Sequence, residues 1–182
     1  ALGFFHVGGG GEMITDYATL MGIEGSSAIV DWIFVELRSK TDPTSIVATR
    51  SALLQRNGNI VDVDGSSSLG FPMLPADDYY LVVRHRNHFG VRSLQSYALS
   101  ATAGNIIDFS DPSFGTFGTN AQNNVSGIQA MIAGEANLDG QVNAVDKNAY
   151  WRVQNGQTYQ YQSSTADFNL DGAINAVDKN AY

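Results

Sequence analysis

Apolar and polar side chains alternate along several short stretches in the front part of the chain. Ile33, Val35 and Leu37 are interleaved with Trp, Phe, Glu and Arg, and a period of two places the three aliphatic side chains on one face of a strand. Other stretches are rich in the β-branched and aromatic residues that strands favour. The pattern predicts strands at residues 32–38, 45–55, 79–85, 97–102 and 106–109.

Turn signals separate these stretches. Asn57 and Gly58 lie between two strand-like runs, which is a strong hairpin signal, and residues 87–90 predict a turn after the third strand. Short strands joined by turns about every eight to twelve residues are typical of a sandwich. The expected fold class is therefore mainly β, with an N-terminal β-sandwich over residues 29–110.

The end of the chain carries two near-identical acidic segments, residues 135–146 and 167–178, which start 32 positions apart (167 minus 135). Along each segment, oxygen-bearing side chains occupy positions 1, 3, 5, 9 and 12, and glycine occupies position 6. Ca²⁺ is bound by roughly six to eight oxygens, and this spacing supplies them together with the carbonyl of position 7. Asn, Asp and Gly also form ordinary turns, but repetition of the whole pattern disfavours chance. The segments predict two calcium sites.

A short helix-compatible run follows each segment, at residues 144–150 and 176–182, and Asn143 and Asn175 are the expected N-caps. An EF-hand would also have a helix before its loop and would usually end the loop with Glu. Here no amphipathic run precedes either segment, and position 12 is Asp. A repeated loop with an exiting helix alone resembles the type I dockerin module, over about residues 133–182.

The dockerin resemblance implies a small C-terminal α/loop domain that binds two calcium ions. The implied ligands of the first site are Glu135, Asn137, Asp139, Asn143 and Asp146, with the carbonyl of Gln141. The implied ligands of the second site are Asp167, Asn169, Asp171, Asn175 and Asp178, with the carbonyl of Ala173. Glu135 is one methylene longer than the Asp at the equivalent place, which predicts weaker binding at the first site.

Dockerins select their receptor domain, a cohesin, through loop positions 10 and 11, and two similar loops imply two docking orientations. Those positions are apolar here and carry no hydroxyl pair: Ala144, Val145, Ala176 and Val177.

The front of the chain resembles a recurrent module of large bacterial surface proteins, especially from Bacteroidetes, which stands before a calcium-loop tail. The sandwich is similar to the transthyretin-like or Cna-B type. The resemblance implies a secreted or cell-surface location and no enzymatic activity. It rests on residues 31–38, 50–55, 60–65 and 79–88.

The composition of the chain disfavours some classes of binding partner and excludes disulfide bonds. A net charge of −8 disfavours nucleic acid and anionic membranes. The chain has no cysteine, so calcium rather than disulfides could cross-link it in the millimolar calcium outside cells.

Two connecting regions complete the expected organisation. Residues 1–28 form an apolar strand followed by a glycine-rich arm. The strand either stays with its own chain, as an edge strand of the sandwich or a frayed terminus, or is donated to a neighbouring subunit. Residues 111–132 read as a linker that contains a glycosylation sequon at Asn124. The domains predicted are residues 1–28, 29–110, 111–132 and 133–182.

Residues 84–88 are the only candidate for an active site, with two Arg and two His. The favoured interpretation is a solvated hairpin tip or a patch that pairs with acidic neighbours. His85 and His88 are three residues apart, which does not converge well in a strand. No nucleophile–base arrangement is visible.

The leading functional hypothesis is a non-enzymatic, extracellular, calcium-stabilised structural protein that assembles with itself into a filament or matrix. The alternatives are a dockerin-like module for a separate receptor protein and a carbohydrate adhesin.

Overall fold

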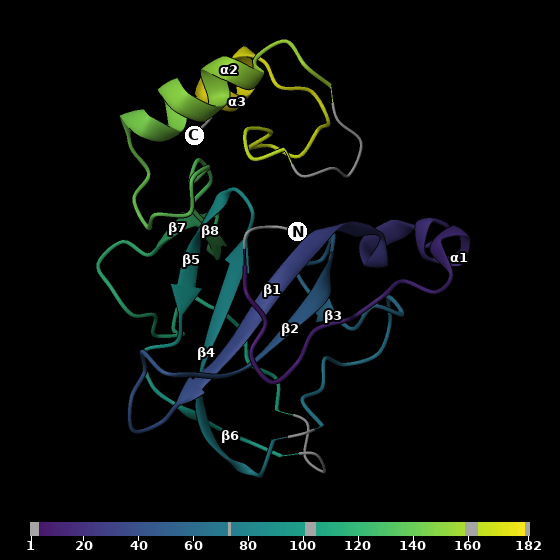
Figure 1. Cartoon of the computed structure of the whole chain (residues 1–182), viewed down its shortest axis with the longest axis vertical. Coiled ribbons are helices and arrows are strands. Elements are labelled where there is room, and N and C mark those ends of the chain that lie inside the picture. Colours follow the sequence, from purple (N-terminus) through teal and green to yellow (C-terminus); the bar gives the residue numbers. More distant parts are fainter. Residues whose placement is uncertain (1–3, 73, 101–104, 159–163, 181–182) are drawn as a thin grey trace.

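The computed structural model describes residues 4–72, 74–100, 105–158 and 164–180. It is mainly β, with a small C-terminal region of loops and short helices (Figure 1), which confirms the mainly β class expected from the sequence. Within the described residues, no helix is long and apolar enough to cross a membrane.

One antiparallel sheet dominates the fold (Figure 1). Its strand order is β3-β2-β1-β4-β5, and β6 pairs with the other end of β4. The described strands therefore form one main sheet and a separate hairpin. The strands are β1 (Ile29–Ser39), β2 (Ile46–Gln55), β3 (Ile60–Val61), β4 (Asp77–His85), β5 (His88–Arg92) and β6 (Tyr97–Leu99).

The predicted alternation in β1 places Ile33 and Val35 on the same face, although residues 33–37 are buried on both faces. Ile33 lies opposite Ala52 of β2, and Val35 lies opposite Val83 of β4. These side chains are almost fully buried and pack against loop and hairpin residues that cover the face, among them Phe71, Phe109 and Met131. Burial of each aliphatic side chain stabilises the fold by about 1.5–3 kcal/mol.

Two local predictions in the front region are wrong. The turn after β4 is only Arg86 and Asn87, and β5 already begins at His88. Residues 106–109 form no strand, because Ile106 is 97% exposed and Phe109 packs through its ring rather than through a backbone ladder.

A hairpin occupies much of the region expected to be a linker. Its strands are β7 (Gln122–Val125) and β8 (Ile128–Met131), and they are joined through Ser126 and Gly127, which both have positive φ. The hairpin joins the main sheet where Phe89 N donates to Ile132 O at 2.7 Å. The sequence gives little signal for β7 because most of its side chains are polar and exposed.

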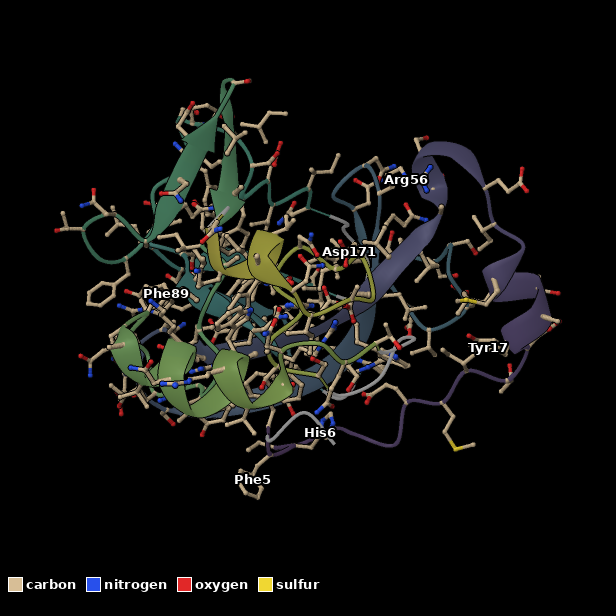
Figure 2. The ribbon with its side chains drawn as sticks, turned by 90° about the horizontal axis from the view of Figure 1, so that it is seen from above. Phe5, His6, Tyr17, Arg56, Phe89 and Asp171 are labelled. Carbon is tan, nitrogen blue, oxygen red and sulfur yellow. The ribbon has the colours of Figure 1, made fainter. Side chains whose placement is uncertain are left out.

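The N-terminal region lies against its own sheet. Thr49 N donates to Val7 O at 2.9 Å, and the ring of Phe4 stacks on Phe34 at 4.9 Å. Further along, helix α1 (Tyr17–Met21) buries Leu20 in a cluster with β2 and β3. Figure 2 shows Phe5 pointing away from the fold. The arm thus takes the first of its two expected placements, on the same chain, from Phe4 onward.

Gly9 allows the arm to approach β2 closely. A Cβ at this position would lie 2.2 Å from Thr49 O. We expect Gly9→Ala to detach the arm and to lower the free energy of unfolding by about 1–3 kcal/mol. Limited proteolysis should then cut within the first twelve residues, and Gly70→Ala, where a Cβ meets open space, should not change the cleavage pattern. Unaltered cleavage in Gly9→Ala would contradict this placement of the arm.

Candidate metal centre

The two acidic segments fold into loops of the same backbone shape. Position 4 is a leucine with positive φ in both, 62° at Leu138 and 63° at Leu170. Position 6 is glycine with φ of 85° at Gly140 and 84° at Gly172. A left-handed leucine is unfavourable, so its occurrence at the same place twice indicates that the surrounding loop holds it there.

Positions 1, 3 and 5 come together in each loop. In the first, Asp139 N donates to Glu135 Oε1 at 3.2 Å, and Asn137 Nδ2 donates to Asp139 Oδ2 at 2.8 Å. The second loop repeats both contacts, at 3.1 and 2.9 Å, among Asp167, Asn169 and Asp171. In Figure 2, Asp171 lies in the loop before the short C-terminal helix.

Position 12 closes each loop. Asp146 accepts from Ala136 N and from Asn143 N, each at 2.8 Å. Asp178 accepts in the same way from the equivalent main-chain groups, again at 2.8 Å. Both side chains are almost completely buried, with exposed fractions of 2% and 0%. The first and last thirds of each loop are therefore joined through one carboxylate.

Position 9 confirms the capping prediction. Asn143 Oδ1 accepts from Val145 N at 2.7 Å, and Asn175 Oδ1 accepts from Val177 N at 2.8 Å. The same two amides donate toward the position-7 carbonyls of Gln141 and Ala173, at 3.4 and 3.3 Å. Asn175 directly precedes α3 (Ala176–Asn180), and Asn143 directly precedes the helical residues 144 and 145. These lead into a π-helical turn (Asp146–Trp151), which has no side-chain cap of its own and continues into α2 (Arg152–Gln154). The last two residues of the second predicted helix lie outside the described residues.

The loop carboxylates fit a hard cation. Glu135 is 2% exposed, and its Oε2 has no hydrogen-bond partner. Burial raises the pKa of Glu135, and the nearby Asp146 raises it further. Burial also raises the pKa of Asp167. Buried carboxylates without a counter-charge are costly, and none of the ion pairs among the described residues involves these loops.

Acidic side chains alone do not complete either site. In the described part of the chain, no three His, Asp or Glu side chains are grouped closely enough to hold a metal by themselves. Amide and main-chain carbonyl oxygens must therefore contribute, and these are ligands that Ca²⁺ accepts. The two loops also differ: Asp167 Oδ2 accepts from Gly172 N at 3.0 Å, whereas Glu135 Oε2 is unpartnered.

The two loops pack into one unit. Ala136 and Phe168, at position 2 of each loop, share a cluster with Tyr150 and Trp151. Trp151 Nε1 donates to Asn175 O at 3.0 Å and so links the first helix to the second loop.

The Arg/His patch is buried rather than solvated. Arg86 is 6% exposed and pairs with Asp31, while Arg84 pairs with Glu36. The hypothesis of pairing with acidic neighbours is thus confirmed, and the solvated tip is wrong. The expectation for the two histidines is also wrong, because the two-residue turn brings His85 Nδ1 to 2.9 Å from His88 Nδ1.

His88 should make stability depend on pH. Burial is the main cause that lowers the pKa of His88, to about 3. The nearby His85 and Arg86 lower this pKa further, whereas Asp31 raises it. The unfolded chain therefore binds a proton below about pH 6.5 that the folded chain does not. In saturating calcium, lowering the pH from 7.5 to 5.5 should reduce the free energy of unfolding by about 1.4 kcal/mol through this residue. Urea unfolding of His88→Asn should show a correspondingly smaller loss, and an identical loss would contradict the assignment.

Sequence reasoning did not foresee that this turn contacts the loops. Asn87 is completely buried and donates from Nδ2 to the carbonyl of Asp167. The sequence held one signal that this turn is buried. Asp31 and Glu36 lie within a largely apolar strand, and buried charges of this kind require buried partners, which are Arg86 and Arg84.

Comparison with known proteins identifies the C-terminal region. Residues 133–181 match the family model of the dockerin type I domain. Neither the comparison with curated proteins nor the comparison with solved structures gave a match. The chain therefore combines a mainly β N-terminal region with a C-terminal region that matches the dockerin type I domain.

Proposed function

We propose that this chain docks onto a cohesin-type receptor protein, in a calcium-dependent manner and outside the cell. The dockerin match over residues 133–181 carries the proposal. Dockerin domains are non-catalytic docking modules that occur in extracellular or cell-surface proteins. The mainly β region would act as a companion of the docking module, which begins at about residue 133 as expected from the sequence. Self-assembly into filaments and glycan binding receive no comparable support.

Two calcium ions are proposed, one in each loop, with the oxygen ligands expected from the sequence. When bound, each ion would offset most of the negative charge carried by positions 1, 5 and 12. The residues themselves close the loops through Asp146 and Asp178. The closed loops in turn support the two short helices that carry the proposed docking surface.

The proposed docking surface is the exposed apolar side of these helices. Val145 and Val177, at position 11 of each loop, are 49% and 52% exposed. Exposed apolar groups gathered on one module suit a protein partner. Because the loops are alike, either valine could serve, in two docking orientations.

Capture by an immobilised cohesin-type domain tests the proposal. Binding should require calcium, and Val145→Glu or Val177→Glu alone should weaken it only modestly, while the double variant should abolish it. Val125→Glu is a matched control, since this valine is 58% exposed on the β7–β8 hairpin. Calcium-independent capture, or full binding by the double variant, would overturn the proposal.

The first loop is expected to bind calcium more weakly than the second. The extra methylene of Glu135 must be accommodated in a loop of the same backbone shape as the second loop, whereas the shorter Asp167 is already held by hydrogen bonds on both oxygens. Calorimetric titration of Asp139→Ala measures the calcium affinity of the second loop, and titration of Asp171→Ala measures that of the first. The dissociation constant should be several-fold lower in Asp139→Ala, and equal dissociation constants would remove the distinction.

A further inference from the structure

One residue of the sheet contacts the entrance of both calcium loops. The main-chain carbonyl of Asn87 accepts from Gly134 N at 3.0 Å, and Gly134 directly precedes position 1 of the first loop. The side chain of Asn87 donates to the carbonyl of Asp167, which is position 1 of the second loop. Asn87 is completely buried, so water cannot replace these contacts.

The neighbours of Asn87 reinforce the same attachment. Phe89 N donates to Ile132 O at 2.7 Å, and Arg86 Nε donates to Ser164 O at 2.8 Å. Both incoming segments are therefore fixed to the β4–β5 turn, at the place where an EF-hand would have its entering helix. Figure 1 shows the tail at the end of the sheet where β4 passes into β5.

We propose that the β4–β5 turn positions both calcium loops, with Asn87 as the main positioning residue, so that calcium binding and the stability of the sheet are coupled. The inference rests on the calcium binding proposed above. A ligand that binds only the folded tail stabilises whatever is ordered together with it. Coupling of this kind is reciprocal, so a loop that is held by the sheet also binds its ion more tightly.

The contacts of Asn87 predict that replacing it lowers calcium affinity unequally at the two loops. Asn87→Ala removes the side-chain donor to Asp167 but keeps the main-chain bond to Gly134. Calcium affinity should fall about tenfold at the second loop, which corresponds to about 1.4 kcal/mol, and clearly less at the first. A general loss of structure would not discriminate between the loops.

Hydrogen exchange and calorimetry on the whole chain test the proposal. In the wild type, added calcium should slow amide exchange in β4 and β5 as well as in the tail. In Asn87→Ala the slowing in β4 and β5 should be reduced. Asn105→Ala is the matched control, because this asparagine also donates from Nδ2 to a main-chain carbonyl, that of Ala98, away from the tail.

The outcomes distinguish the proposed coupling from the proposed calcium binding. If calcium slows amide exchange only in the tail of the wild type, the coupling is overturned and calcium binding is not. This part of the test needs no variant that folds. Equal affinity loss at both loops, or none, in a folded Asn87→Ala would also overturn it. No calcium-dependent change anywhere in the wild type would overturn the calcium binding itself.

Discussion

Replacing Asp178 with alanine is expected to abolish calcium binding at the second loop and to unfold most of the tail. Its carboxylate accepts main-chain N–H groups from Phe168, Asn169 and Asn175, at 2.8, 3.3 and 2.8 Å, and it is completely buried. Its loss leaves those donors unsatisfied, at about 1–3 kcal/mol for each buried group. It also removes the proposed ligand of position 12. Calorimetry should find at least a hundredfold loss of affinity at this loop.

Two control variants separate the causes. Asp178→Asn keeps an oxygen acceptor of the same size and removes the charge, so it should retain more tail structure than Asp178→Ala yet bind calcium weakly. Asp42→Ala removes an exposed aspartate that caps a turn in the sheet region, and it should leave calcium binding unchanged. Wild-type affinity in Asp178→Ala would show that position 12 is not a ligand.

Arg86→Met should be the most destabilising single change in the sheet region. Arg86 and Asp31 are both more than 90% buried and paired. Although burial opposes ionisation, hydrogen bonds from His85 and Arg86 lower the pKa of Asp31 to about 2. Removing the guanidinium leaves this buried carboxylate with only His85 and the Trp32 amide as partners, and it also removes the donor to Ser164 O. The expected loss is about 3–5 kcal/mol in the free energy of unfolding, measured with urea.

A second arginine provides the matched comparison. Arg38 also pairs with a buried carboxylate, Glu36, but Glu36 keeps Arg84 as another partner. Arg38→Met should therefore cost about 1 kcal/mol, close to an ordinary ion pair. In the background of Asp31→Asn, Arg86→Met should cost much less than it does alone. Equal losses from the two arginine variants would contradict this account of the buried pair.

Local patterns predict local structure well in this chain. The loops follow from repeated ligand spacing, and the caps at Asn143 and Asn175 follow from the same segments. Strand β1 follows from the alternation of Ile33, Val35 and Leu37 with bulkier and polar residues.

Contacts between distant segments are not visible in such patterns. Arg86 meets Asp31 across 55 positions and Ser164 across 78, so its burial cannot be inferred from its polar neighbours. Hairpin β7–β8 escaped prediction because the side chains of β7 are mostly polar and exposed, so β7 shows no apolar alternation. The position of the N-terminal arm depends on the edge of β2, which only the assembled sheet provides.

Native mass spectrometry of the whole chain, purified in calcium, tests the central claim most directly because it counts bound ions. Two calcium ions per chain are predicted for the wild type, one for Asp146→Ala, one for Asp178→Ala and none for the double variant. A wild-type chain that carries no calcium under these conditions would contradict the account.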